Sequence, residues 1–323
     1  MKYWIFVNKF LLLLVMWAGI SSQGVCQIDK NKEVWFTDIK QAELQADRVY
    51  NLDLSGQSLD SLPDIISTFK NVRFLKLSDN NISSLNGRLK QLTSLVYLEL
   101  SGNKFKTLDF SEFCGSQASI VEVWLRDNQL TAIDTSINCL KNLSSLNIGN
   151  NRLVNLPAGI ILPRLKKLSL DNNFITEQPK TLHFSPKIAY LNLYGNAIEK
   201  IYFEKYFRNI TYLNLGDNPL ISMQFEIIPS KLTTLILDWV DLSEFDLQNL
   251  PKSIQVLSME HCNLNRIDAI LYLINLKELS LIQNNLTELP SGLRNLPKLR
   301  KLWIGGNSIF QQLDFPPYIS VVE

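Results

Sequence analysis

The feature that most constrains this chain is a phrase of 22 to 25 residues that recurs twelve times. Each copy carries apolar residues at its first, fourth and sixth positions, for example Leu143, Leu146 and Ile148. Gaps of three and then two residues fit neither a helix nor a regular strand, so each copy predicts one turn of a coil. The twelve repeats begin at Val49, Val72, Leu95, Ile120, Leu143, Leu165, Ile188, Ile210, Leu232, Ile254, Leu276 and Leu299.

The ninth position of the repeat is Asn in nine of the twelve copies. The preceding residues predict a short strand, and the turn after it leaves backbone N–H and C=O groups that face the interior and need partners. An Asn amide offers two donors and an acceptor oxygen, enough to tie its own turn to the next. We therefore predict a structural ladder of Asn80, Asn103, Asn128, Asn151, Asn173, Asn196, Asn218, Asn284 and Asn307. The exceptions are Gln57, Val240 and Cys262, and we expect the last two to let the adjacent turn adopt its own shape.

This spacing resembles the signature of the leucine-rich repeat family, L-x-x-L-x-L-x-x-N/C-x-L. The resemblance covers Val49 to about Ile309, and twelve copies in phase are far more specific than a single motif. It implies an α/β fold, a curved solenoid with a parallel β-sheet on its concave face. Pro and Gly in the later part of several repeats, as in residues 156–163, predict short 3₁₀ or irregular turns on the convex face. Residues 49–309 then form one elongated domain in which each repeat packs on its neighbours.

The first 26 residues differ from the repeats and are typical of an export signal. Lys2 and Lys9 flank the start, an apolar core follows at residues 10–20, and small residues precede Cys26. An uncleaved signal anchor is the alternative, and the lead-in to Cys26 is poor for a lipid anchor. We expect a secreted, periplasmic or cell-surface protein whose mature chain has no membrane span.

The segments on either side of the solenoid are expected to cap its apolar ends. Residues 27–48 are predicted to form a helical cap, with Thr37 as the N-cap of a helix that reaches about Ala46. Residues 310–323 contain Pro316-Pro317, which excludes a helix there. This tail either forms a minimal cap or marks the place of a partner.

Four cysteines occur, and none forms a C-x-x-C pair of the kind that binds metal. Cys114 and Cys139 occupy the twentieth place of adjacent repeats, where stacked turns bring them within reach of a disulfide in an oxidising compartment. Two small buried residues are the alternative interpretation. Cys262 falls at the ninth position and is expected to be a buried structural thiol.

Charge and motifs argue against several classes of function. The 32 Lys and Arg residues nearly balance the 31 Asp and Glu residues, so no bulk field attracts nucleic acid or an anionic membrane. Only two histidines occur, and no G-x-S-x-G, P-loop or H-E-x-x-H motif is present. The Asp residues near the turns reflect turn propensity rather than a calcium site. We therefore expect no enzyme activity, cofactor or metal.

The concave face is the remaining candidate for function. Most of its outward positions are small or polar, and the large exceptions gather in two groups of repeats. Strand propensity explains any single one of them, but exposed aromatic patches with polar surroundings mark interaction surfaces. We expect this face to bind a protein or peptide, with a glycan-binding or adhesive module and a structural spacer as alternatives. The candidate binding residues are Phe74, Tyr97, Trp124, Tyr190, Tyr194, Tyr212, Ile236 and Trp239, and Trp303 stands alone.

Overall fold

The structure is a computed structural model that describes residues 34–114, 119–178, 185–226, 228–310 and 314–323 of the 323-residue chain. The chain divides into two compact units, Met1–Val34 and Trp35–Glu323. The predicted export signal, residues 1–26, and residues 27–33 of the predicted N-terminal cap lie outside the described residues. In the described part of the chain, no helix is long and apolar enough to cross a bilayer.

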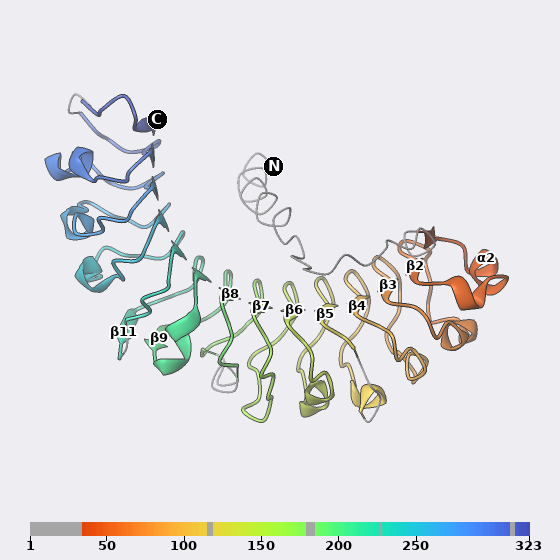
Figure 1. The fold of residues 1–323 in the computed structure, drawn as a ribbon. Helices are drawn as coiled ribbons and strands as arrows, with labels where there is room; N and C mark the ends of the chain where they lie inside the picture. The colour runs from red at the N-terminus through yellow and green to blue at the C-terminus, as the bar shows by residue number, and fades with distance from the viewer. Residues whose placement is uncertain (1–33, 115–118, 179–184, 227, 311–313) are drawn as a thin grey trace. The chain divides into compact units, whose positions relative to one another are not determined.

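The second unit is a solenoid built on one parallel sheet of fourteen strands. Figure 1 shows β2 to β8 following one another along the inner side of an arc, with the 3₁₀ turns on its outer side. Each of the twelve repeats contributes one strand, and all its first, fourth and sixth positions are buried. The strands are β1 (Trp35–Phe36), β2 (Asn51–Asp53), β3 (Phe74–Lys76), β4 (Tyr97–Glu99), β5 (Glu122–Trp124), β6 (Ser145–Asn147), β7 (Lys167–Ser169), β8 (Tyr190–Asn192), β10 (Tyr212–Asn214), β12 (Thr234–Ile236), β13 (Val256–Ser258), β14 (Glu278–Ser280), β15 (Lys301–Trp303) and β16 (Ser320–Val322).

The convex side carries short 3₁₀ helices, as the Pro and Gly residues predict, but it also carries a second sheet. β9 (Lys200–Phe203) and β11 (Ser222–Phe225) pair in parallel there (Figure 1). The expectation of only 3₁₀ or irregular turns was therefore wrong for these two repeats. The reason is visible in β9, where Ile201 and Phe203 are buried while Lys200 and Tyr202 are exposed. That strict alternation favours a strand. The 3₁₀ helices are η2 (Ala46–Arg48), η3 (Asp64–Thr68), η4 (Ser111–Phe113), η5 (Thr135–Cys139), η7 (Lys205–Asn209), η8 (Leu247–Asn249), η9 (Asp268–Ile270) and η10 (Ser291–Asn295).

The flanking segments extend the sheet as well as covering its ends. α2 (Ile39–Glu43) is shorter than predicted, and its N-cap is Asp38 rather than Thr37. The Asp38 carboxylate accepts hydrogen bonds from the backbone N–H of Lys40 and Gln41 at 2.7 and 3.1 Å, which satisfies two free donors of the first turn. At the other end, β16 pairs with β15 beyond the last repeat. The tail therefore adds a strand to the sheet.

The ninth-position Asn side chains join successive turns by the bonds that an amide allows. Asn151 shows the pattern: its Nδ2 donates to the carbonyl oxygens of Ile148 at 3.1 Å and Leu125 in the previous repeat at 2.9 Å. Its Oδ1 accepts from the backbone N–H of Leu130 at 2.9 Å. The ladder thus satisfies backbone groups on both sides of each interface. Eight of the nine residues are buried, and Asn307 at the end is half-buried.

Cys262 replaces one of these amides with a thiol. Burial raises the pKa of the Cys262 thiol to about 12, so the group keeps its proton. Its Sγ lies 3.2 Å from the carbonyl oxygens of Leu237 and Glu260, to which it donates. The thiol therefore supplies one weak donor, shared between these two oxygens, where Asn supplies two, and it offers no acceptor oxygen. The Leu242 N–H donates instead to the Cys262 carbonyl oxygen at 2.9 Å.

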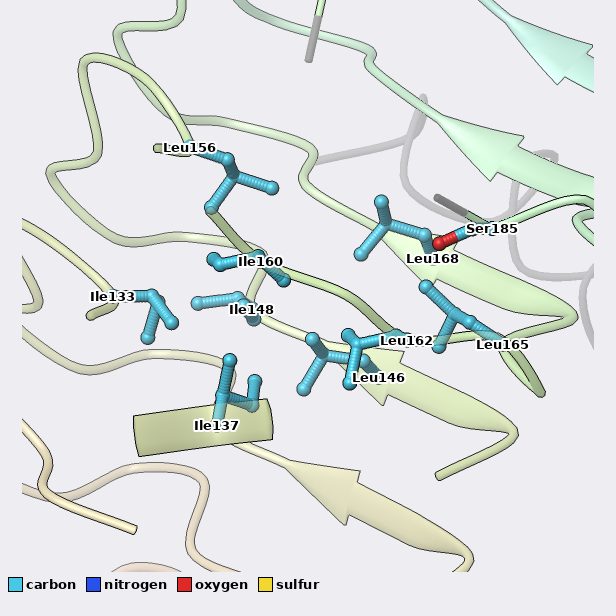
Figure 2. Close-up of a pocket in the computed structure, with 10 residues that line it drawn as sticks. All are labelled: Ile133, Ile137, Leu146, Ile148, Leu156, Ile160, Leu162, Leu165, Leu168 and Ser185. Carbon is cyan, nitrogen blue, oxygen red and sulfur yellow. The ribbon is translucent and has the colours of Figure 1, made fainter. Parts of the chain in front are cut away.

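Two further features belong to the interior and the convex side. Cys114 and Cys139 form a disulfide between repeats three and four, with their Cα atoms 4.8 Å apart. A small apolar pocket lies inside the coil in repeats four to six, lined by aliphatic side chains such as Leu146 and Leu168 and by Ser185 (Figure 2). Its lining is core side chains with one hydroxyl, so this pocket offers little chemistry for a ligand.

Candidate binding surface on the concave face

The parallel pairing places the same position of successive repeats side by side across the concave face. Tyr190, Tyr212 and Thr234, all at the third position, are consecutive partners in register. Neighbouring strands in a sheet lie about 4.8 Å apart, so outward residues of adjacent repeats are in reach of one another. The candidate residues therefore form rows across the repeats, and each group is described in turn.

The first group, here named the N-terminal aromatic cluster, consists of Trp35, Phe74 and Tyr97. The ring centroids of Phe74 and Tyr97 are 6.2 Å apart, and those of Trp35 and Phe74 are 6.4 Å apart. The Lys76 ammonium lies 4.3 Å from the centre of the Trp35 ring, within the range of a cation–π contact. The sequence did not reveal Trp35 because it precedes the first repeat.

Trp124, predicted with this group, lies in a different row. It occupies the fifth position, in register with Glu99 and Asn147. Its indole Nε1 is buried and has no hydrogen-bond partner among the described residues. The Tyr97 hydroxyl donates to the Glu99 carboxylate at 2.8 Å. This bond ties the polar end of Tyr97 to the protein itself.

Tyr190 and Tyr212 begin the second group as a stacked pair. Their ring centroids are 4.3 Å apart and the planes differ by 9°. Burial raises the pKa of Tyr190 to about 12 and moves the pKa of Tyr212 well above its usual value. Because both rings are largely covered by the protein itself, the pair stabilises the sheet as well as forming part of its surface.

Trp239 is the most exposed aromatic residue of the second group. It keeps 55% of its surface accessible and stacks on His261 of the next repeat, with ring centroids 3.7 Å apart and planes within 10°. The sequence placed His261 at a solvent-facing position but did not predict this contact. Ile236 lies three positions before Trp239, at the end of β12, and is half-buried.

Both stacked residues occupy an unusual backbone site. The eighth position of every repeat has positive φ: Gly56, Asp79, Gly102, Asp127, Asn150, Asn172, Gly195, Asp217, Trp239, His261, Gln283 and Gly306. Gly, Asn and Asp adopt this left-handed conformation readily, whereas a bulky side chain there is an outlier. Trp239 has φ 64° and His261 has φ 55°, like the Asp217 turn at 51°. Without the Asn amide, the turn after Trp239 keeps the left-handed eighth position of the other repeats but changes its hydrogen bonds, since the Val240 N–H donates to the Leu237 carbonyl oxygen at 3.1 Å and the Leu242 N–H to that of Cys262 at 2.9 Å. A bulky residue at such a site carries backbone strain.

Two carboxylates lie beside this pair at the seventh position. Asp238 Oδ1 accepts from the Ser258 hydroxyl at 2.6 Å and from the Glu260 N–H at 2.9 Å. Glu260 Oε1 accepts from the Ser280 hydroxyl at 2.5 Å. Burial raises the pKa of the Asp238 carboxyl to about 6, and the charge of Glu260 adds to this shift while the two hydrogen bonds oppose it.

The outward positions of repeats seven to ten combine rings with negative charge. They contain the carboxylates Asp217, Asp238 and Glu260 and no Lys or Arg. We name this the aromatic–acidic surface; it consists of Tyr190, Tyr194, Tyr212, Asp217, Ile236, Asp238, Trp239, Glu260 and His261. Sequence reasoning found its rings and Ile236 but missed its carboxylates and His261, because such residues at a turn are ordinary. Among the described residues, no group of three or more His, Cys, Asp and Glu could hold a metal ion.

Comparison with known proteins identifies the repeat. A family model described as leucine rich repeat matches residues 47–105 and 141–198, and a model of two leucine rich repeats matches residues 274–317. The chain belongs to the leucine-rich repeat family. The predicted fold is confirmed, and proteins of this family commonly mediate protein–protein interactions on a fold that is typically a binding scaffold.

Individual relatives share the repeat rather than the whole protein. The probable inactive serine/threonine-protein kinase roco10 from Dictyostelium discoideum is 35% identical over 126 residues, which cover 38% of this chain and 5% of that protein. The functional domain of InlJ from Listeria monocytogenes gives a TM-score of 0.62 at 23% identity, covering 79% of this chain and 53% of that one. A chain of the Toll–Spätzle complex from Drosophila gives a TM-score of 0.68 at 20% identity, covering 88% of this chain and 42% of that one. At these identities the two structures show the fold alone.

Proposed function

We propose that this leucine-rich repeat protein is an exported, non-enzymatic binding protein that holds a protein or peptide on its aromatic–acidic surface. The observation that carries the proposal is the stacked pair of Trp239 and His261. Two rings occupy backbone sites that elsewhere in the chain hold mostly Gly, Asn or Asp, and Trp239 remains 55% exposed. A strained, exposed ring stabilises the free protein little, whereas such rings concentrate binding energy when a partner covers them.

The surroundings of the pair support a macromolecular ligand. The rings of Tyr190, Tyr194 and Tyr212 lie on the same face, so a partner crossing repeats seven to ten meets a broad aromatic surface with a polar rim. The N-terminal aromatic cluster is a less favourable site because Lys76 and Glu99 already occupy its polar contacts. Phe74, Tyr97 and Trp124 therefore come second as binding residues in this proposal.

Export is proposed from two independent features. Residues 1–26 have the charge and apolar pattern of an export signal. Cys114 and Cys139 form a disulfide, and disulfides persist in oxidising compartments outside the cytoplasm. We expect a secreted, periplasmic or cell-surface location. Mass spectrometry of the N-terminus of the protein recovered from its host tests this, and an intact Met1 on cytoplasmic protein would contradict it.

Partner capture tests the binding proposal directly. Wild-type protein, Trp239→Ala and Glu244→Ala are immobilised in parallel and exposed to extracellular proteins of the host, and the same three proteins are applied to a glycan array. Glu244 is exposed and lies outside the concave face, so it is the matched control. We expect a protein that binds wild type and Glu244→Ala and binds Trp239→Ala at least tenfold more weakly. Glycan binding lost in Trp239→Ala would favour the lectin alternative, and no ligand of either kind would favour the spacer.

A further inference from the structure

The seventh positions of repeats four, five and six form an internal ion pair that crosses one repeat. Arg126 Nη1 lies 2.6 Å from Asp171 Oδ2, two repeats further along. Gly149 lies between them and leaves the space: a Cβ on Gly149 would lie 2.5 Å from Arg126 Nη1 and 2.6 Å from Asp171 Oδ1. The guanidinium of Arg126 therefore passes over the glycine to reach the carboxylate.

Repeats seven, eight and nine also carry a large residue, a glycine and an aspartate at the seventh position, but without the cation, and the Asp238 carboxylate accepts its hydrogen bonds from repeat ten. Their seventh positions are Tyr194, Gly216 and Asp238, in place of Arg126, Gly149 and Asp171. A Cβ on Gly216 would lie 3.1 Å from Tyr194 Cδ2, so the tyrosine ring lies over this glycine. A ring cannot neutralise a carboxylate, and no Lys or Arg of the described residues forms an ion pair with Asp238.

Further carboxylates near Asp238 increase the negative charge that a cation would neutralise. Glu260 lies in the next repeat and Asp217 in the previous one, and His261 is the one outward residue of repeats seven to ten that can carry a positive charge, since none is Lys or Arg. Burial, together with the nearby charges of Asp217 and Asp238, raises the pKa of the Tyr194 hydroxyl, and Trp239 directly follows Asp238 in the chain. Aromatic faces attract cations, and an arginine guanidinium also stacks on them while its N–H groups bind carboxylates.

We infer that the aromatic–acidic surface receives an arginine or lysine side chain of a basic peptide segment in its partner, between the carboxylates of Asp238 and Glu260 and against the rings of Tyr194 and Trp239. This inference rests on the proposed function and names the chemistry of its partner. The incoming side chain supplies the positive charge that Arg126 supplies within the chain three repeats earlier. A desolvated carboxylate that lacks a cation is also one that gains most from meeting one.

The inference is tested by selecting peptides that bind the protein and then replacing their basic residues with neutral analogues of similar shape. A displayed library of random 12-residue peptides is selected on the purified full chain, and enriched peptides are synthesised and titrated. Each is remade with citrulline for arginine and norleucine for lysine, which keep the shape and remove the charge. We expect enriched peptides to contain a basic residue whose replacement weakens binding at least tenfold. Asp238→Asn and Glu260→Gln should weaken binding to a similar degree, and the control Glu122→Gln, an outward carboxylate of repeat four, should not.

The outcomes separate this inference from the proposed function. Peptides that require Trp239 but lack a basic residue, or that bind equally well after its replacement, would overturn the inference and leave the binding surface in place. Asp238→Asn together with Glu260→Gln leaving affinity unchanged would overturn it as well. If no peptide is enriched, or if binding does not depend on Trp239, both the inference and the proposed surface are wrong.

Discussion

Trp239, the residue that carries the proposed binding surface, occupies a backbone conformation that costs the fold stability. Its φ of 64° is a conformation that glycine adopts freely and residues with a Cβ adopt at a cost. Stacking on His261 offsets part of this cost in the free protein. The same ring is thus strained in its backbone, satisfied on one face and open to a ligand on the other.

Replacing Trp239 by Gly and by Ala separates the backbone cost from the lost ring. Both variants remove the indole and its contact with His261, and only Ala retains a Cβ at positive φ. We expect Trp239→Gly to be more stable than Trp239→Ala by about 1 kcal/mol in free energy of unfolding, measured by urea titration. The same comparison at Ser58→Gly against Ser58→Ala, at another positive φ, is the control. Equal stability of the two Trp239 variants would show that the turn relaxes when the ring is removed.

Asp238 gives a second test at the scale of one residue, through pH. Its pKa in the folded protein is about 6, above the ordinary value of 3.8, so the folded state holds the proton more tightly than the unfolded chain. The contribution of Asp238 to stability is therefore largest below pH 4 and falls as pH rises from about 4 to about 6. Asp238→Asn keeps the Oδ1 acceptor of Ser258 and Glu260 N–H and removes the charge. We expect the free energy of unfolding of this variant to exceed that of wild type by on the order of 2 kcal/mol at pH 7.5 and to differ little from it at pH 4.

Asp241→Asn is the matched control, with the opposite sign. Hydrogen bonds from the Ser243 hydroxyl and N–H lower the pKa of the Asp241 carboxyl, so its ionised form favours the folded state. Its substitution should lower stability at pH 7.5 rather than raise it. Thermal melts of the three proteins between pH 4 and pH 8 measure both effects. A difference between Asp238→Asn and wild type that does not change with pH would contradict the assignment.

At the scale of the element, the repeat register predicted the strands and the ladder because both depend on fixed spacing. All first, fourth and sixth positions are buried, and the nine Asn residues bridge adjacent turns. In a coil with this period, residues at these positions face the interior in every turn. The N-cap of α2 and the convex strands β9 and β11 were not predicted. The N-cap depends on a local hydrogen bond, and the convex strands depend on segments in which polar and apolar residues alternate. The repeat pattern specifies neither feature. The eighth-position conformation was also missed, although its Gly, Asn and Asp residues carry the signal.

The ladder makes a prediction at this scale. Asn151→Ala should lower the free energy of unfolding by on the order of 1–3 kcal/mol, because buried backbone groups in two repeats lose their partner. Asn151→Cys should cost less, since Cys262 shows that a thiol donates to carbonyl oxygens at the same position. The exposed Asn155→Ala is a better control than Asn147→Ala, because Asn147 accepts a hydrogen bond from the Gly149 N–H at 3.0 Å. Urea melts decide the order, and equal values for Asn151→Ala and Asn155→Ala would remove the structural role of the ladder.

At the scale of the whole repeat array, each strand of the main sheet pairs with the strands of adjacent repeats, and β1 and β16 continue that order at the ends. Stability in such an array is close to a sum of repeats and nearest-neighbour interfaces. The sequence predicted this architecture because periodicity alone dictates it. The place of the binding surface did not follow from periodicity, since it depends on where the chain departs from its own consensus: Trp239, His261 and the absence of an arginine before Gly216.

A core truncation far from the aromatic–acidic surface tests whether the array is local in its energetics. Leu98 lies at the fourth position of repeat three and is fully buried, so Leu98→Ala should cost about 2–5 kcal/mol in its own region. Because contacts run only between neighbours, we expect faster amide hydrogen exchange in repeats two to four and unchanged exchange in repeats nine to eleven. The matched truncation Leu257→Ala, at the fourth position of repeat ten, should reverse the pattern and weaken peptide binding. Uniformly faster exchange along the whole chain in either variant would show that the solenoid unfolds as one cooperative unit, and substitutions in any repeat would then affect the binding surface.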